Sequence, residues 1–117
     1  MTLREFYDML GGDYAGTLGR MMKEDRMKKY LLRLPDSKDY TDCLNAFEAK
    51  DYDLAFRASH NLKGMALNLG LTKLAESSSE LCESVRHGAP AGDVSDLIEK
   101  MKADYEETIL AIQVNLA

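Results

Sequence analysis

The sequence has no tryptophan, only two prolines and two cysteines, and no apolar run near the roughly 20 residues of a membrane-spanning helix. Its first residues, MTLREFYDML, lack the apolar segment of a signal peptide. The catalytic motifs CxxC, GxSxG and HExxH and the Walker glycine loop are all missing. These absences argue against most classes of enzyme. We expect a cytoplasmic protein in which Cys43 and Cys82 are free thiols.

Basic residues are also fewer than acidic ones. Lysine and arginine number 15 against 20 acidic residues, which gives a formal net charge of -5. A general nucleic-acid binder needs a basic face to displace counterions, and an anionic membrane attracts basic segments. We therefore expect neither nucleic acid nor a membrane as partner. The length suits a single domain over residues 1–117.

Helical periodicity is what the sequence does contain. Leu, Ala, Met, Glu and Lys dominate the composition, and no segment shows the sustained alternation of a strand. The pattern predicts short helices over about 2–10, 13–22 and 25–34, and longer ones over about 37–50, 52–69 and 72–87. A last helix is predicted from about 90 or 93 to 115. This order predicts an all-α fold, an antiparallel four-helix bundle with short N-terminal helices packed over one end.

The helix expected over 52–69 contains a glycine in its interior. Gly64 lowers helix stability there by roughly 1 kcal/mol relative to alanine. At 100° per residue, the apolar residues gather on one side, and His60 points almost opposite to them. These apolar residues are Leu54, Ala55, Ala58, Leu62, Met65 and Leu69. The periodicity therefore predicts an exposed His60 rather than a core histidine.

The neighbours of His60 on that outer face are unusual. Lys63 and Gly64 follow at i+3 and i+4, the two positions that adjoin the imidazole. A side chain at 64 would lean over the ring, because helical side chains point toward the N-terminus. Glycine therefore leaves the ring open, and Lys63 supplies a cation beside it.

Apolar residues flank this pair where a solvated helix would carry charge. Phe56 and Leu67 lie on the same face as His60 and predict a docking surface. Arg57 and Asn68 are further candidates for partner contacts, although Asn68 fits a solvated position equally well.

An exposed imidazole of this kind has a specific chemistry. Neutral histidine is a nucleophile at physiological pH and is one of the side chains that form covalent intermediates. A phosphoryl group on the ring brings negative charge, which Lys63 offsets. An exposed ring fits a partner protein that supplies the remaining groups, whereas a kinase or hydrolase needs a cleft of its own. His87, the second histidine, is expected to interact with the dipole at a helix C-terminus.

The stretch SHNLKGMALNLGLTKL resembles the core motif of histidine-containing phosphotransfer domains of two-component phosphorelays. The motif positions are His60, Leu62, Lys63, Gly64, Gly70 and Leu74. The flanking segments DYDLAFRASH and ELCESVRHG, and the N-terminal residues 13–36, are also similar to the family. Met65 and Leu67 depart from it, since many members carry small residues there.

This resemblance implies a phosphocarrier with no kinase or hydrolase activity of its own. His60 would carry the phosphoryl group, with Lys63 and Gly64 as its supporting pair. The implied partners are receiver domains of response regulators or hybrid sensor histidine kinases, which would hold Mg²⁺ themselves. No cofactor is implied for this chain, which we expect to be a monomer.

Two other functions remain as alternatives. The first is an interaction module, which has the same fold and binds receivers without being phosphorylated. The presence of His60 and Lys63 argues against it. A metal- or haem-binding helical bundle would need ligands that point inward. The chain has only two histidines and lacks the Glu-x-x-His signature of carboxylate-bridged bundles.

Overall fold

The structure, a computed structural model, describes all 117 residues and is entirely helical, as the periodicity predicts. Its elements are α1 (Leu3–Leu10), α2 (Tyr14–Met21), α3 (Glu24–Arg33), the 3-10 turn η1 (Leu34–Asp36), α4 (Lys38–Glu48), α5 (Tyr52–Asn68), α6 (Thr72–Ser84) and α7 (Ser95–Asn115). No helix in the structure combines the length and apolarity needed to cross a bilayer.

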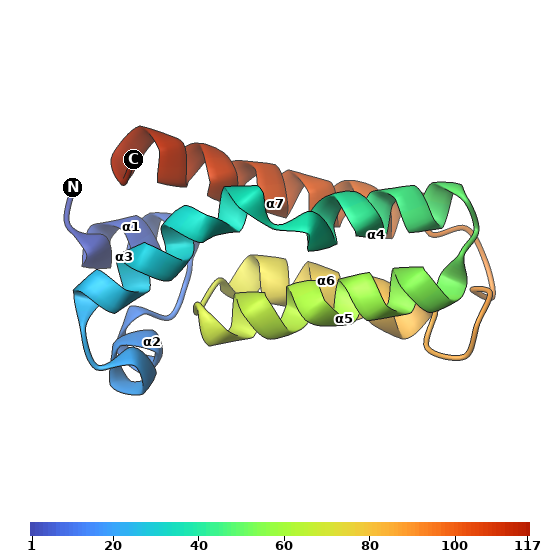
Figure 1. Cartoon of the computed structure of the whole chain (residues 1–117), viewed down its shortest axis with the longest axis horizontal. Helices are drawn as coiled ribbons and strands as arrows, with labels where there is room; N and C mark the ends of the chain where they lie inside the picture. Colours follow the sequence, from blue (N-terminus) through green and yellow to red (C-terminus); the bar gives the residue numbers. More distant parts are fainter.

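Helices α4 to α7 form the expected antiparallel bundle (Figure 1). Helix α5 packs between α4 and α6, and α6 packs on α7. The rings of Tyr40 and Tyr105 stack with centroids 3.7 Å apart and join α4 to α7. The short helices α1 to α3 lie at the end of the bundle that holds the α5–α6 turn, and both chain termini lie at that end (Figure 1).

Side-chain caps begin several helices close to the predicted starting positions. Thr2 and Glu5 form a capping box on α1, and Asp13 caps α2. Ser37 caps α4, while the carboxylate of Asp51 accepts from the backbone of α5. Each cap satisfies an N–H group that the first turn of a helix leaves unpaired, which fixes where the helix begins.

The prediction was too long at the α6–α7 connection. Helix α6 ends at Ser84, and His87 lies exposed in the turn beyond it. Helix α7 begins at Ser95, because the carboxylate of Asp93 accepts from both the backbone N–H and the hydroxyl of Ser95. Such a local turn competes with helix at this position.

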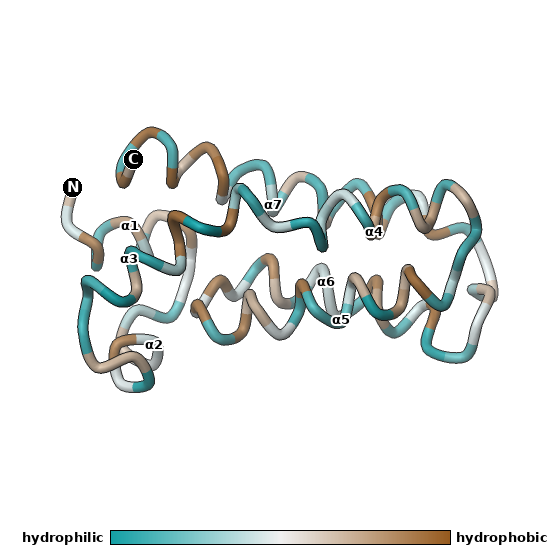
Figure 2. The backbone as a smooth tube through the Cα atoms, viewed as in Figure 1, coloured by the Kyte–Doolittle hydropathy of each residue, from teal (hydrophilic) through white to brown (hydrophobic).

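The core runs through the bundle and continues under the N-terminal helices. Hydrophobic and hydrophilic residues alternate along every helix of the tube in Figure 2. Phe6 and Tyr7 of α1 are fully buried, as are Leu62 of α5 and Leu81 of α6. The buried phenol of Tyr7 donates to the carbonyl of Leu69 at 2.7 Å. This bond ties α1 to the end of α5.

The cysteines are both buried and unpaired. Burial raises the pKa of the Cys43 thiol to about 12. Cys82 lies at the α5–α6 contact, where its sulfur is 3.9 Å from the carbonyl oxygen of Phe56. The expectation of free thiols is confirmed.

Close packing of two glycines fixes the N-terminal helices against the α5–α6 turn. Gly70 has φ +69°, and a Cβ there would lie 2.1 Å from Oγ1 of Thr17 and 2.7 Å from the carbonyl oxygen of Asp13. A Cβ on Gly12 would lie 2.6 Å from the carbonyl oxygen of Gly70. The backbone N–H of Asp13 donates to that same oxygen at 2.9 Å. Only glycine fits at position 70.

Candidate functional site

Helix α5 presents its small and apolar residues to the bundle and His60 to solvent. Ala55, Ala58 and Leu62 are buried and His60 is exposed, as the helical wheel predicts. The wheel was inaccurate at its edges: Leu54 and Met65 are only half-buried. The buried stripe instead includes Ser59 and Ala66, because α5 is packed between two neighbours rather than against one. The Ser59 hydroxyl donates to the carbonyl of Ala55 at 2.6 Å.

The imidazole of His60 stacks on an aromatic ring. The ring centroids of Phe56 and His60 lie 5.9 Å apart, with the two planes inclined by 18°. Phe56 is half-buried, and its ring also lies 5.6 Å from the guanidinium carbon of Arg86. Phe56, which the sequence predicts as a docking residue, thus contacts the imidazole of His60 in the protein itself. The stacking restricts the orientation of the imidazole.

Gly64 leaves open space beside the site. A Cβ at this position would meet no atom within 4 Å outside the nearby helix backbone. The fold therefore does not require glycine here. A methyl at 64 would not contact the imidazole. That a longer side chain there would lean over the ring stays a prediction. The space that Gly64 opens lies on the exposed outer surface of α5.

Charged groups from α5 and α6 meet on one side of His60. Lys63 is half-buried, and the Nε of Arg86 donates to Glu83 at 2.9 Å. The hydrogen bond from Arg86, with weaker contributions from the charges of Lys63 and His87, lowers the pKa of the Glu83 carboxyl. Glu83 of α6 therefore pairs with Arg86 and is also influenced by the charges of Lys63 and His87.

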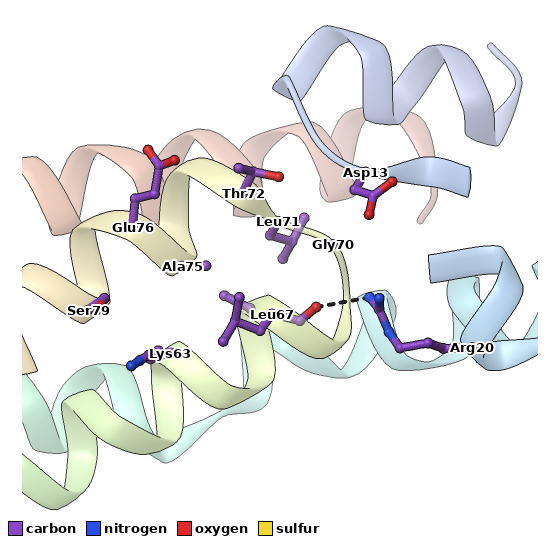
Figure 3. Close-up of a pocket in the computed structure, with 11 residues that line it drawn as sticks. Asp13, Arg20, Lys63, Leu67, Gly70, Leu71, Thr72, Ala75, Glu76 and Ser79 are labelled. Carbon is purple, nitrogen blue, oxygen red and sulfur yellow. Dashed lines mark hydrogen bonds between the residues drawn. The ribbon is translucent and has the colours of Figure 1, made fainter. Parts of the chain in front are cut away.

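A pocket of about 370 Å³ continues from Lys63 toward the N-terminal helices. Lys63 and Leu67 of α5 and Glu76 of α6 line it, together with Arg20 of α2 (Figure 3). Leu67 is 55% exposed at its edge. The guanidinium of Arg20 donates to the carbonyl oxygens of Leu67 and Asn68 at 3.0 and 3.1 Å, and thereby caps the C-terminal end of α5.

The structure thus brings most of the predicted site residues to one face. His60, Gly64 and Leu67 are exposed along α5, with Lys63 on the side of α6. Arg57 and Asn68 are exposed as well, displaced around the helix toward α4. No group of three or more His, Cys, Asp or Glu side chains converges as metal ligands would.

Sequence reasoning missed Glu83, Arg86 and Arg20. The first two could have been found by counting outward from the turn at Gly70, because antiparallel helices place residues near 56 beside residues near 84. No comparable signal exists for Arg20, since its place depends on how α2 folds back on the bundle.

Comparison with known proteins agrees with this geometry. The family model described as "Hpt domain" matches residues 34–111, which are 78 of the 117 residues. This range begins at η1 and extends into α7, and it leaves α1 to α3 outside. Searches of the curated proteins and of the solved structures found no match. The match covers more than half of the chain, and the protein therefore belongs to the Hpt domain family.

Proposed function

We propose that this chain is a phosphorelay intermediate that carries a phosphoryl group on His60. In the forward step, a ring nitrogen of His60 attacks the acyl phosphate of a receiver aspartate. The N–P bond forms as the O–P bond breaks, and the aspartate returns to its carboxylate. The reverse step passes the group to the aspartate of a second receiver. The chain would act as one domain over residues 1–117 and as a cytoplasmic monomer.

The observation that carries this proposal is the exposed imidazole between Lys63 and Phe56 in a chain of the Hpt family. The ring is accessible to a partner, and Phe56 limits its orientation. Lys63, one turn further along α5, offsets the charge of the phosphoryl oxygens.

The surroundings of His60 also favour a carrier over an enzyme. The imidazole lies on an open helix surface rather than in a cleft of converging acid and base groups. We therefore assign no kinase or hydrolase activity to the chain, and we assign the Mg²⁺ of the transfer reaction to the receiver. Leu67, Arg57 and Asn68 are proposed to contact that receiver.

The two histidines of the chain provide a matched test. The protein is incubated with a phosphorylated receiver domain, and labelled phosphate on the wild type, His60→Gln and His87→Gln is compared. Both side chains are exposed, so both substitutions should change stability by no more than about 0.5 kcal/mol. We expect His60→Gln to lose all label and His87→Gln to retain it. Receiver binding with no label on the wild type would instead identify an interaction module that is not phosphorylated.

A further inference from the structure

A second cation, in addition to Lys63, lies against the aromatic ring that stacks on His60. The guanidinium carbon of Arg86 is 5.6 Å from the centroid of the Phe56 ring, and that ring lies 5.9 Å from the imidazole of His60. Arg86 is exposed and belongs to the turn that follows α6. Its long side chain can therefore move from the phenyl ring toward a group bound on the imidazole.

Glu83 holds this cation in the unphosphorylated protein. Two nitrogens of the Arg86 guanidinium, Nε and one terminal nitrogen, donate to the two carboxylate oxygens of Glu83. The charge of Lys63 acts on the same carboxylate and helps to lower its pKa. Glu83 thus pairs with Arg86, one of the two cations that a phosphoryl group on His60 would use.

We propose that Arg86 is a phosphoryl-binding residue and that Glu83 takes the place of the phosphoryl group when His60 is free. This inference rests on the proposed function of His60. Transfer replaces a neutral imidazole by a group with a charge of about -1.5 to -2 and three acceptor oxygens. Arg86 then exchanges the single charge of Glu83 for the larger charge on His60, where its planar fork donates to phosphoryl oxygens.

The chain offers a matched pair for comparison. Glu80, one turn before Glu83 on α6, pairs with Lys100 of α7 at 3.5 Å, on the side of α6 that faces α7. Exposure is similar in the two pairs: 45% and 51% for Arg86 and Glu83, and 55% and 50% for Lys100 and Glu80. Substitutions in the two pairs therefore change net charge and surface alike, and differ in their position relative to His60.

The experiment measures two quantities on each variant. The first is the rate of phosphoryl transfer from a phosphorylated receiver domain, and the second is the lifetime of the phosphohistidine after the receiver is removed. The second measurement does not depend on docking. The variants are Arg86→Gln, Glu83→Gln and their combination, with Lys100→Gln and Glu80→Gln as controls, and thermal melts check that all of them are folded.

Arg86→Gln should slow transfer about three- to tenfold and shorten the phosphohistidine lifetime, because a charge-assisted contact to the phosphoryl group is lost. Glu83→Gln should raise the transfer rate about two- to threefold, within the range of exposed ion pairs. The double variant should behave as Arg86→Gln, since Glu83 acts mainly by holding Arg86. Both controls should stay near the wild type.

The possible failures are distinguishable. A labelled wild type with Arg86→Gln no different from Lys100→Gln would overturn the role of Arg86 and leave the proposed function intact. Slower transfer in Glu83→Gln would overturn the role of Glu83 as a substitute for the phosphoryl group. A wild type that takes no label would overturn the proposed function and, with it, this inference.

Discussion

Gly64 and Gly70 are six residues apart, yet the structure makes different demands on them. A Cβ at Gly64 would meet nothing, whereas one at Gly70 would overlap Thr17 and Asp13 on a backbone with φ +69°. The sequence alone shows two glycines of the same motif. It cannot show that one of them is required by the fold, because the atoms that exclude a side chain at Gly70 come from α2 and the loop before it.

Alanine at the two positions should therefore have opposite effects on stability. Gly64→Ala should raise the free energy of unfolding by about 0.4–1 kcal/mol, since the site is helical and alanine loses less entropy on folding. Gly70→Ala should lower it by about 2–4 kcal/mol, because it adds a left-handed residue and a steric overlap. Chemical denaturation measures both. A destabilised Gly64→Ala would contradict the open space seen above this residue.

Gly64→Leu tests the functional side of the same residue. A leucine here would extend into the open space at Gly64, through which we propose that a receiver reaches His60. The transfer rate should therefore fall well below that of Gly64→Ala. The rate is measured with a phosphorylated receiver in excess, on protein whose thermal melt confirms folding. Transfer by Gly64→Leu at the wild-type rate would show that the glycine does not serve access.

Lys63→Ala should slow transfer and shorten the phosphohistidine lifetime without preventing receiver binding. The physical reason is the loss of a cation one turn from His60. Lys73→Ala is the matched control, because Lys73 is exposed and pairs with Glu107 instead. Transfer and binding are measured separately. A Lys63→Ala variant that loses only affinity would make Lys63 a docking residue.

At the scale of the element, the sequence predicted α5 better than its surroundings. Its cap, Asp51, and the exposure of His60 follow from rules that act within a few residues. The burial of Ser59 does not, because it depends on how closely a second helix approaches. The contact of Arg86 with Phe56 joins α5 to the turn after α6, and only the antiparallel pairing of α5 and α6 indicates it in the sequence.

A substitution on the outer face of α5 tests whether this face docks on the receiver. Leu67→Glu should weaken receiver binding strongly and change stability little, since Leu67 is 55% exposed on the side of His60. Leu110→Glu on α7 is the control, because Leu110 is 62% exposed and lies on another helix. Calorimetric titration with a cognate receiver gives both affinities. Equal affinities in the two variants would remove Leu67 from the docking surface.

For the whole molecule, the sequence predicted the architecture but not the contacts by which the N-terminal helices pack on the bundle. The order of helices and the short N-terminal segments were enough to give a bundle with a covered end. The contacts that fix this cover were not visible: the phenol of Tyr7 on the carbonyl of Leu69, and Gly12 against Gly70. These residues are far apart in sequence and have no shared periodicity.

Burial of acidic groups gives the whole molecule a pH dependence in the alkaline range. Burial raises the pKa of Tyr7 and of Tyr40 from 10.0 to about 12, and that of Cys43 from 9.0 to about 12. These groups must ionise more readily in the unfolded chain. Their contribution to stability is therefore complete below the unfolded pKa values and is lost as pH rises toward 12.

The free energy of unfolding should thus begin to fall near pH 9 and decrease further up to about pH 12. Tyr7→Phe should reduce the slope in this window. It should also lower stability at neutral pH by about 1 kcal/mol, because the carbonyl of Leu69 loses its donor. Denaturation curves between neutral pH and pH 12 measure both effects. An unchanged slope in Tyr7→Phe would contradict the burial of this phenol.

The proposed function depends on the transfer of a phosphoryl group from a receiver aspartate to His60. The most direct measurement is mass spectrometry of the wild-type protein after incubation with a phosphorylated receiver domain, with the modified peptide sequenced and its stability to acid and to base compared. We expect one phosphoryl group on His60, lost in acid and retained in base. A protein that binds the receiver but gains no phosphoryl group, or gains it on another residue, would contradict a phosphocarrier role for His60.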